Sequence, residues 1–427
     1  MDAIPDDWEL LKMKYLFSER VQKGYPDEPL LAATQTMGVV PKSLYENRTV
    51  VAMKDLHLLK LVKQGDYVIS LRSFEGGIEY AHYRGIISPA YTVLCPGDIA
   101  KRDYFEFFFK SKPFVDALTL YVTGIREGQN IDYNKLCNTE LPVPPIETQE
   151  KIGGFLRFAI AKINHLIRAK RRVIELLNEQ KQAIIHRAVT RGLDPNVPLK
   201  PSGIDWLGDI PEHWSVKRLK WVTRLQRGYD LPSDRRLQGT IPVVSSGGII
   251  DTHSEARAIA PGVVMGRYGS TDSVFYLEEE FWPHNTALFV TNFQGNDPRW
   301  CYYLLRVISK VDLGSKSAVP GVDRKDLYEI PVAIPPLREQ PSIAAQVADQ
   351  LNHFEKVTQS VQFQIDRLRE YRTRLIADVV TGKLDVRGVE LPELEPEDAL
   401  EPLSDSEEGE LEEAEELLAA GEDSDAD

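Results

Sequence analysis

The sequence has few cysteines and no long apolar run. Three cysteines occur among its 427 residues, and no two of them have the CxxC spacing. Closely spaced or paired cysteines are what zinc sites and disulfide frameworks require, so Cys95, Cys137 and Cys301 are predicted to be reduced core residues. No stretch approaches the eighteen apolar residues of a membrane span, and residues 1–5 (MDAIP) lack a basic-then-apolar leader. These features predict a cytoplasmic protein without a membrane segment.

Motifs for catalysis and cofactor binding are also missing. The sequence contains no GxGxxG, no Walker-type GxxxxGK and no Asx-Pro-Pro-aromatic stretch. A Gly-Lys pair at 382–383 has Ala377 where a phosphate loop needs glycine, and the proline pairs after Val143 and Ile334 lack a preceding polar residue. The eight histidines show no metal-ligand spacing. We therefore predict no catalytic residue, no metal and no cofactor bound by this chain.

Basic residues are absent from the end of the chain. From Glu390 onward there are eighteen Asp or Glu and no Lys or Arg, so residues 1–389 carry all 51 basic residues against 47 acidic ones, a net of +4. A block of like charges repels itself and buries little apolar surface, which predicts a disordered acidic tail. Such a tail either only solubilises the protein or mimics nucleic-acid charge and competes for a basic groove.

A long heptad helix occurs twice. Apolar residues recur every seven positions from Leu156, with a second row four residues behind each, and adding 191 gives the pattern again. Polar residues also match between the two copies, since Lys181 corresponds to Arg372 and Gln149 to Gln340. The predicted core positions are Leu156, Ile160, Ile163, Ile167, Ile174, Leu177, Ile184, Val347, Leu351, Phe354, Val361, Ile365, Leu368 and Leu375.

These two helices are predicted to form a two-stranded coiled coil with each other. Apolar residues at helical spacing usually mark the buried stripe of a globular helix, but here the period holds for over forty residues on a narrow, charge-flanked row. At about 1.5 Å per residue, forty-odd residues make a rod on the order of 60–65 Å long. That is close to two turns of B-DNA at about 34 Å each, so the helices have the length of a spacer.

The repeat extends beyond the helices. The opening Ile-Pro-Asp-Asp-Trp at 4–8 returns as Ile-Pro-Glu-His-Trp at 210–214, and strands starting near Gly65 and Gly262 each end at a basic loop. We predict an α+β fold with two similar globular domains, two long helices and a tail. The predicted boundaries are 1–142 first domain, 143–192 first helix, 193–213 connector, 214–334 second domain, 335–385 second helix and 386–427 tail.

The connector at 191–208 (RGLDPNVPLKPSGIDWLG), running into residues 210–214, resembles the central region of DNA-specificity subunits of type I restriction-modification systems. The proline knuckles with Gln149 and Gln340 and the strand-loops at Gly65 and Gly262 are similar as well. The resemblance covers nearly all of residues 1–389, is most specific in the connector and the helices, and leaves the acidic tail outside the family pattern.

The resemblance implies a non-catalytic subunit whose two target recognition domains each read one half of a split, asymmetric DNA sequence. The two helices would pack antiparallel and set the gap between the half-sites. Two copies of a methyltransferase subunit would be recruited, and restriction would also need motor subunits. S-adenosylmethionine, ATP and magnesium would then be bound by those partner subunits.

Basic residues near the Gly-containing loops are the candidates for DNA contact, because the arginine fork of donors fits guanine edges and phosphates. The predicted set is Arg72, Ser73, Arg84, Lys101, Arg102, Arg126, Arg235, Arg236, Arg267, Tyr268, Ser270, Arg324 and Lys325. An arginine beside a glycine is more often a solvated turn, so the local signal is weak. The aromatic run at 104–109 favours a core helix over a base-stacking platform.

Two functions from other classes stay open on the sequence alone. One is an enzyme, such as a single-chain nuclease or methyltransferase with unfamiliar motifs. The other is a coiled-coil scaffold that binds only proteins. The salt dependence of DNA binding discriminates the scaffold from a DNA reader, because neutralised phosphates make affinity fall as salt rises.

Overall fold

The computed structural model describes residues 4–35, 37–44, 55–123, 130–267, 273–311 and 323–392. The chain divides into two compact units, residues 1–171 with 363–427 (unit 1) and residues 172–362 (unit 2). Helices α6 (Ile146–Arg191) and α9 (Gln340–Val380) each contribute one part to unit 1 and the other part to unit 2. Both helices lie within the predicted spans of 143–192 and 335–385.

Unit 1 is built on a four-stranded antiparallel sheet of order β2-β9-β6-β7. Helix α3 and its C-cap residue Phe109 pack on it through aromatic rings. Phe105 and Phe109 contact Phe17 of β2 edge-on or tilted, and Phe109 contacts Tyr67 of β6. Three pairs, β1–β12, β3–β4 and β5–β8, surround this sheet, and β10 pairs with β11. The elements are β1 (Glu9–Lys12), α1 (Met13–Leu16), β2 (Phe17–Glu19), β3 (Leu31–Thr34), β4 (Gly38–Pro41), β5 (Lys60–Val62), β6 (Tyr67–Ile69), α2 (Ser73–Gly76), β7 (Glu79–Tyr80), β8 (Gly85–Ile87), β9 (Thr92–Pro96), α3 (Arg102–Phe108), α4 (Lys112–Leu118), β10 (Val122–Thr123), β11 (Asn130–Ile131), α5 (Tyr133–Leu136) and β12 (Glu140–Val143).

Unit 2 has a four-stranded sheet of order β16-β22-β19-β20 and a three-stranded sheet of order β18-β17-β21. Helix α7 supplies Trp300, Cys301 and Leu304 to a core that also holds Val263 and Met265 of β19. The elements are β13 (Leu199–Pro201), β14 (Asp209–Pro211), β15 (Ser215–Arg218), β16 (Arg224–Arg227), β17 (Ile241–Ser245), β18 (Gly248–His253), β19 (Gly262–Gly266), β20 (Val274–Leu277), β21 (Trp282–Pro283), β22 (Ala287–Asn292), α7 (Pro298–Ile308), α8 (Arg324–Glu329) and β23 (Pro331–Ile334).

The two globular parts share one frame. Strand β12 directly precedes α6 and pairs with β1, and β23 directly precedes α9 and pairs in the same way with β15. The four-stranded sheets also have matching strand orders. The register matches as well, because Tyr67 of β6 faces Tyr80 of β7 and Val263 of β19 faces Tyr276 of β20. The repeat seen in the sequence is therefore a repeat of hydrogen-bonded structure.

A buried glutamine joins each long helix to its neighbouring globular domain. The Gln149 amide donates to the carbonyl oxygens of Ile99 (3.0 Å) and Pro144 (2.8 Å), and its oxygen accepts from the Lys101 N–H (3.0 Å). We call this set the unit 1 latch. Because every hydrogen-bonding group of the amide is used inside the protein, the residue can be fully buried without an orphaned polar atom.

Unit 2 contains the same device. The Gln340 amide donates to the Pro335 carbonyl oxygen (3.2 Å) and to Asn296 Oδ1 (2.9 Å), and its oxygen accepts from the Asp297 N–H (2.8 Å). Gln340 is also fully buried. We call this set the unit 2 latch. In both units it fixes the start of a long helix to the loop that precedes the aromatic helix α3 or α7.

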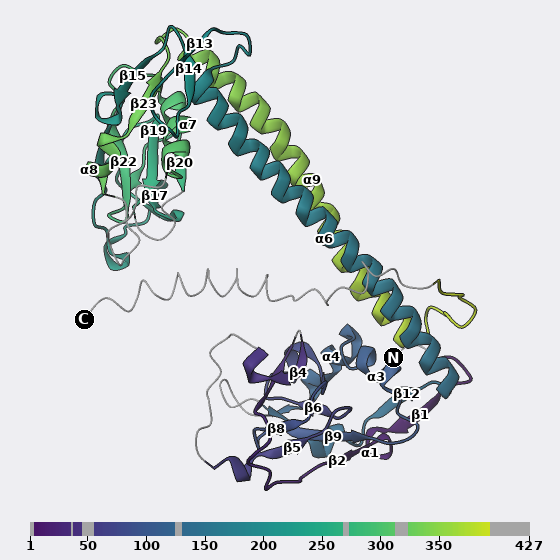
Figure 1. The fold of residues 1–427 in the computed structure, drawn as a ribbon. Coiled ribbons are helices and arrows are strands. Elements are labelled where there is room, and N and C mark those ends of the chain that lie inside the picture. Colours follow the sequence, from purple (N-terminus) through teal and green to yellow (C-terminus); the bar gives the residue numbers. More distant parts are fainter. Residues whose placement is uncertain are drawn as a thin grey trace. The chain divides into compact units, whose positions relative to one another are not determined.

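Helices α6 and α9 run side by side, as Figure 1 shows. In unit 1, Arg372 donates to Asn164 Oδ1 (3.0 Å) and Lys170 to Gln364 Oε1 (2.6 Å). In unit 2, Lys181 pairs with Glu355 (3.6 Å). As the residue number rises along α6, that of the partner falls along α9, so the paired segments are antiparallel. Arg372–Asn164 and Lys181–Glu355 are also the same pair under the 191-residue repeat.

All fourteen predicted coiled-coil core residues are buried or half-buried. The most enclosed are Leu156, Ile167, Val347 and Ile365, each with at most one per cent of its surface exposed. A sheet-containing chain with two helices of 46 and 41 residues is a mixed α/β fold, which agrees with the predicted class at that level.

The ends of α6 and α9 repeat one motif. Gly192 and Gly382 have φ of 73° and 75°, the left-handed conformation that ends a helix at low cost only for glycine. Each lies against a tryptophan ring, Trp214 in unit 2 and Trp8 in unit 1. Shortly after each glycine, Asp194 and Asp385 accept a backbone N–H from two positions ahead (2.8 and 3.0 Å).

Candidate nucleic-acid interface

The candidate loops follow the central strands of the two four-stranded sheets. In unit 1, β6 leads through Leu71 to Arg72 and the single-turn helix α2. In unit 2, β19 leads directly to Arg267. The fold therefore puts a basic residue at the same edge of the same sheet in both units, which is the arrangement that the sequence predicted.

Arg72 and Ser73 differ in accessibility. Arg72 is exposed, whereas Ser73 is 2% exposed. The Ser73 hydroxyl accepts from the Ser70 N–H (2.8 Å) and lies 3.3 Å from the Ser70 hydroxyl, so it stabilises the turn between β6 and α2. Because a buried hydroxyl engaged in a turn cannot reach a base edge, direct DNA contact by Ser73 does not fit the structure, and its role is to shape the loop that carries Arg72.

The side chain of Lys110 also holds this loop in place. Its ammonium donates to the carbonyl oxygens of Gly76 (2.9 Å) and Gln35 (3.0 Å) and pairs with the carboxylate of Glu79. Glu79 is 2% exposed, and burial raises the pKa of its carboxyl to about 7, although Lys110 opposes this shift. The end of α2 is thus tied to β7 and to the β3–β4 turn, which holds the Arg72 loop in one shape.

Sequence reasoning missed this anchor. The signal that could have found it is one carboxylate inside the otherwise apolar stretch 77–81 (GIEYA), since a buried Glu needs a cationic partner. The partner lies 31 residues further on, after the aromatic helix, and no spacing rule would have connected the two.

Three other basic candidates in unit 1 have partners within the unit. Arg84 pairs with Glu28 (2.7 Å), and Arg102 pairs with Glu106 (2.8 Å) while its guanidinium lies 4.2 Å from the Tyr80 ring centroid. Lys101 is half-buried and its N–H belongs to the unit 1 latch. The ion pairs of Arg84 and Arg102 are partly exposed and worth little, so both guanidinium groups can exchange a carboxylate for a phosphate at small cost.

The candidates in unit 2 are more varied. Arg267 is half-buried, and its N–H donates to the Thr286 carbonyl oxygen (3.1 Å). Arg235 is exposed in a 3₁₀ turn, whereas Arg236 is held by the Leu231 carbonyl oxygen and by Asp251, both at 3.3 Å.

Arg324 and Lys325 are exposed in the first turn of α8, whose cap Asp323 accepts from the Lys325 N–H (2.9 Å). Both side chains are exposed cations, and the carboxylates of Asp323 and Asp326 lie in the same turn. The candidates Arg126, Tyr268 and Ser270 lie outside the described residues, as do the Gly128 and Gly321 turns, so their predicted contacts stay predictions.

An arginine that the sequence did not single out occupies a repeated position. Arg299 lies 4.9 Å from the Tyr276 ring centroid, and Tyr276 is the strand counterpart of Tyr80, over which Arg102 lies. Each unit therefore carries a guanidinium over the tyrosine of the strand next to its central strand. Aligning the two copies by strand register, rather than by loop composition, would have identified this pair.

The aromatic run at 104–109 serves the core, as predicted. Tyr104, Phe105, Phe108 and Phe109 are buried, and the Tyr104 hydroxyl donates to the carbonyl oxygens of Pro142 (3.1 Å) or Val380 (2.8 Å). Burial raises the pKa of Tyr104 well above its ordinary value, which keeps the hydroxyl protonated as a donor. These rings are unavailable for stacking on bases.

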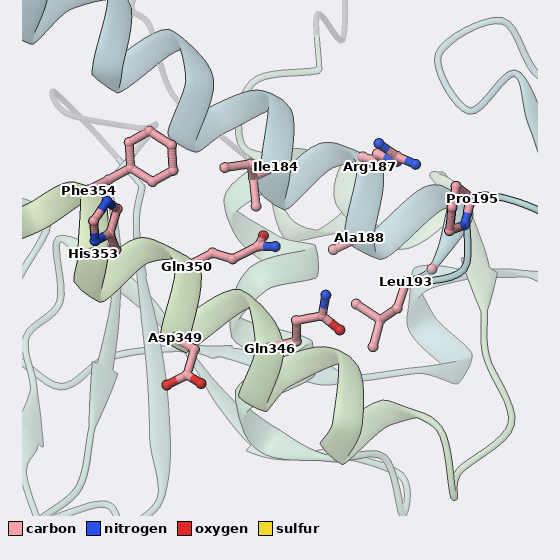
Figure 2. A pocket seen from close by; sticks show the side chains of 11 residues that line it. Ile184, Arg187, Ala188, Leu193, Pro195, Gln346, Asp349, Gln350, His353 and Phe354 are labelled. Carbon is pink, nitrogen blue, oxygen red and sulfur yellow. The ribbon is translucent and has the colours of Figure 1, made fainter.

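A groove of about 680 Å³ lies in unit 2 where α6 ends beside α9. Figure 2 shows Arg187 and Ala188 presented by α6, Gln346 and Asp349 by α9, and Leu193 at the connector end. The repeat counterparts of Gln346 and Asp349 in unit 1 are Phe155 and Phe158. At these two positions the lining is polar in unit 2, whereas the counterparts in unit 1 are phenylalanines.

The described residues hold no group of three or more His, Cys, Asp or Glu arranged as metal ligands. Cys95, Cys137 and Cys301 are free thiols, with Cys301 fully buried and the other two half-buried. Within the described part of the chain, no helix has the length and apolarity to cross a membrane.

Comparisons with known proteins agree with the geometry. The family described as "Type I restriction modification DNA specificity domain" matches residues 211–361. The MjaVIII specificity subunit of a type I restriction enzyme from Methanocaldococcus jannaschii is 21% identical over 426 residues, covering 90% of this chain and 95% of the relative. A second protein of that organism, the putative MjaX specificity subunit, is 22% identical over 430 residues with the same coverage.

A solved chain of a type I restriction-modification system, from a study of its complex assembly and conformational transition, has the same fold. Its TM-score is 0.67 at 15% identity, with 90% of this chain and 100% of that chain covered. The family match and the two relatives confirm the resemblance drawn from the connector and the proline knuckles.

Proposed function

We propose that this chain is a DNA-specificity subunit of a type I restriction-modification system and reads a two-part asymmetric DNA sequence with one half-site per globular domain. The observation that carries the proposal is the repeated frame with a basic loop at the same sheet edge, Arg72 in unit 1 and Arg267 in unit 2. Two copies of one frame with different loop residues suit two different half-sites.

The long helices act as the spacer between the two half-sites. The antiparallel pairs formed by Asn164, Lys170 and Lys181 fix the register of α6 against α9, so the helix length determines the gap. Inserting one heptad into each helix at matched positions adds about 10 Å to the rod. The gap should then grow by about 3 base pairs at 3.4 Å each. An unchanged gap would contradict the spacer.

The chain itself performs no catalysis in this proposal. It recruits two methyltransferase subunits, and the restriction subunits join through that complex. S-adenosylmethionine, ATP and magnesium are bound by those partners. The internal repeat of the helices and latches offers two equivalent docking surfaces, which suits two identical partners.

The decisive experiment is co-expression with the cognate methyltransferase subunit in a host that lacks DNA methylation, followed by methylation-sensitive sequencing of the genome. We expect adenine methylation at a two-part motif with a fixed gap. Exchanging residues 1–142 for those of a related subunit should change one half of the motif and leave the other half intact. A stable complex that methylates nothing would favour the alternative, a coiled-coil scaffold that binds only proteins.

The salt dependence of DNA binding tests the loops directly. Under the proposal, Arg72→Gln and Arg267→Gln each remove a positive charge at the DNA, and removing one phosphate contact lowers the slope of log affinity against log salt by about 1. An arginine that reads a guanine instead costs about 1–3 kcal/mol of discrimination at one base pair. Arg218→Gln, an exposed arginine paired with Glu329, is the matched control and should leave both quantities unchanged. A flat salt response of the unmodified complex would contradict DNA reading.

A further inference from the structure

Four exposed residues form a line along α9 that we call the α9 stripe: Phe363, Arg367, Tyr371 and Arg374. Their spacing of four, four and three residues puts them on one face of the helix. Phe363 and Tyr371 are 59% and 55% exposed, and the Arg367 guanidinium lies 5.1 Å from the Phe363 ring centroid. The whole stripe belongs to unit 1.

The internal repeat supplies a matched face for comparison. Subtracting 191 from each position gives Arg172, Leu176, Gln180 and Ala183 on α6, which are also exposed. Both faces point away from the helix pair, so packing requires nothing special of either. At each of the four positions, the side chain of the α9 stripe differs from its counterpart on α6. The aromatic rings and arginines of the stripe are therefore not needed for the coiled coil.

The composition of the stripe is that of a binding surface. Aromatic residues and arginine are enriched in protein interfaces, and a row of large apolar side chains in water is a cost that a docked partner removes. Arg367 pairs with Glu370 and Arg374 with Asp378, all at the surface. Exposed pairs of this kind contribute little, so both arginines can take carboxylates from another segment instead.

The acidic tail has the charge opposite to that of the two arginines of the α9 stripe, and it begins in unit 1, where the stripe lies. Beyond α9, Val386 is buried and Arg387 pairs with Asp7 (2.8 Å), which fixes the start of the acidic tail to unit 1. From Glu390 onward the tail has eighteen Asp or Glu and no Lys or Arg, and its stretch 410–418 (ELEEAEELL) combines carboxylates with three leucines.

The tail is long enough to reach the stripe. Positions 371 and 363 lie 9 and 17 residues before the end of α9 at Val380, or about 14 and 26 Å along the helix axis. A flexible chain of 25 residues, which is the number that separates Val386 from position 411, would span about 25–30 Å. Tethering on this scale gives an effective concentration on the order of millimolar, so weak contacts suffice for docking.

We propose that the acidic tail docks on the α9 stripe of its own chain. Carboxylates of residues 410–418 pair with Arg367 and Arg374, and leucines of that stretch cover the rings of Phe363 and Tyr371. This intramolecular contact does not depend on the DNA-reading proposal, because it needs neither nucleic acid nor a partner subunit.

Limited digestion of the full chain with a glutamate-specific protease tests the docking. Intact mass spectrometry would follow cleavage after the glutamates of residues 407–416. In dilute salt we expect cleavage about fivefold slower in the unmodified chain than in the variant Arg367→Glu/Arg374→Glu. The difference should vanish near 0.5 M salt, where screening reduces the charge contribution. Phe363→Ser/Tyr371→Ser should also speed cleavage, and this effect should persist in salt.

The matched control introduces two glutamates on the counterpart face of α6. Leu176→Glu/Ala183→Glu changes the repeat counterparts of Arg367 and Arg374 and should leave tail cleavage at the unmodified rate. Far-UV circular dichroism checks that all three double variants keep their helices. Equal cleavage rates in all chains, or equal acceleration by both glutamate pairs, would overturn the proposal. Stripe variants that lose the methyltransferase subunit without a change in tail cleavage would assign the stripe to that partner and overturn it too.

Discussion

The two globular domains share their sheets and their latches but anchor their candidate loops differently. In unit 1, Val68 of the central strand faces Glu79, whose carboxylate pairs with Lys110 under the Arg72 loop. In unit 2, Val264 at the corresponding position faces Phe275, which packs in an apolar cluster. The same frame is thus completed by a buried ion pair in one copy and by an aromatic ring in the other.

The difference separates what the fold requires from what each copy can vary. Both glutamine latches are kept with two donated bonds and one accepted bond, because each must satisfy the polar groups where a long helix meets its domain. The residue that faces the central strand is free to change, from Glu79 in unit 1 to Phe275 in unit 2. Either an ion pair or an aromatic ring can support the end of that strand. The proposed reading of two different half-sites would use this combination, because the latch holds each domain to its helix while the residues near the loop vary.

The largest expected effect comes from breaking a latch. Gln149→Leu orphans the Lys101 N–H and the carbonyl oxygens of Ile99 and Pro144, at about 1–3 kcal/mol for each buried group. We expect unit 1 to lose about 4 kcal/mol of stability against opening. Gln340→Leu should cost about 3 kcal/mol in unit 2, since one of its partners is the Asn296 side chain, which can rotate to another partner.

Hydrogen exchange measured by mass spectrometry on peptides of each unit is the suitable readout, because a chain of two units need not unfold in one step. Each latch variant should raise exchange in its own unit and leave the other near its original level. Gln180→Leu, on the exposed face of α6, is the control and should change little. Equal exchange increases in both units from either latch variant would show that the latches are not local joints.

The buried carboxylate gives the second prediction, which concerns pH. Because burial raises the Glu79 pKa to about 7 from 4.5, the folded state keeps the proton between these values while the unfolded state releases it. The stability from this group is fully present below about pH 4.5 and is lost as pH rises through 7. The shift of about 2.5 pKa units corresponds to about 3 kcal/mol.

Glu79→Gln removes this dependence. The stability of unit 1 in the unmodified chain minus that in the variant should fall by about 3 kcal/mol between pH 4.5 and 7.5. Hydrogen exchange of unit 1 peptides across this range measures the difference, after correction for the intrinsic pH dependence of exchange. Unit 2, with Phe275 at the same register, should show no such change. A difference that stays constant or grows with pH would contradict the assignment of the proton to Glu79.

The repeat explains how far the sequence could predict this structure. Spacing rules found both long helices and their core rows, because a heptad pattern such as Leu156 to Ile184 reports burial residue by residue. They also found Gln149 and Gln340 as equivalent positions, although the bonds of the latches needed coordinates. The Lys110–Glu79 pair and the burial of Ser73 could not be predicted, since both depend on contacts between separate elements that no single-sequence periodicity records.

The smallest expected effect compares the two polar bridges of the helix pair, which occupy the same repeat position. Arg372 donates to Asn164, which is 7% exposed, whereas Lys181 pairs with Glu355, whose side chain is 54% exposed. Arg372→Met leaves a buried amide oxygen without this donor and should cost unit 1 about 1 kcal/mol. Lys181→Met removes a solvated pair and should cost unit 2 less than about 0.5 kcal/mol.

Unit-resolved hydrogen exchange in dilute salt and near 0.5 M salt measures both costs. Because solvated charge pairs are screened and buried hydrogen bonds are not, the cost in unit 2 should vanish in the higher salt while that in unit 1 persists. The reverse order would mean that the bridge of unit 2 is the more desolvated one.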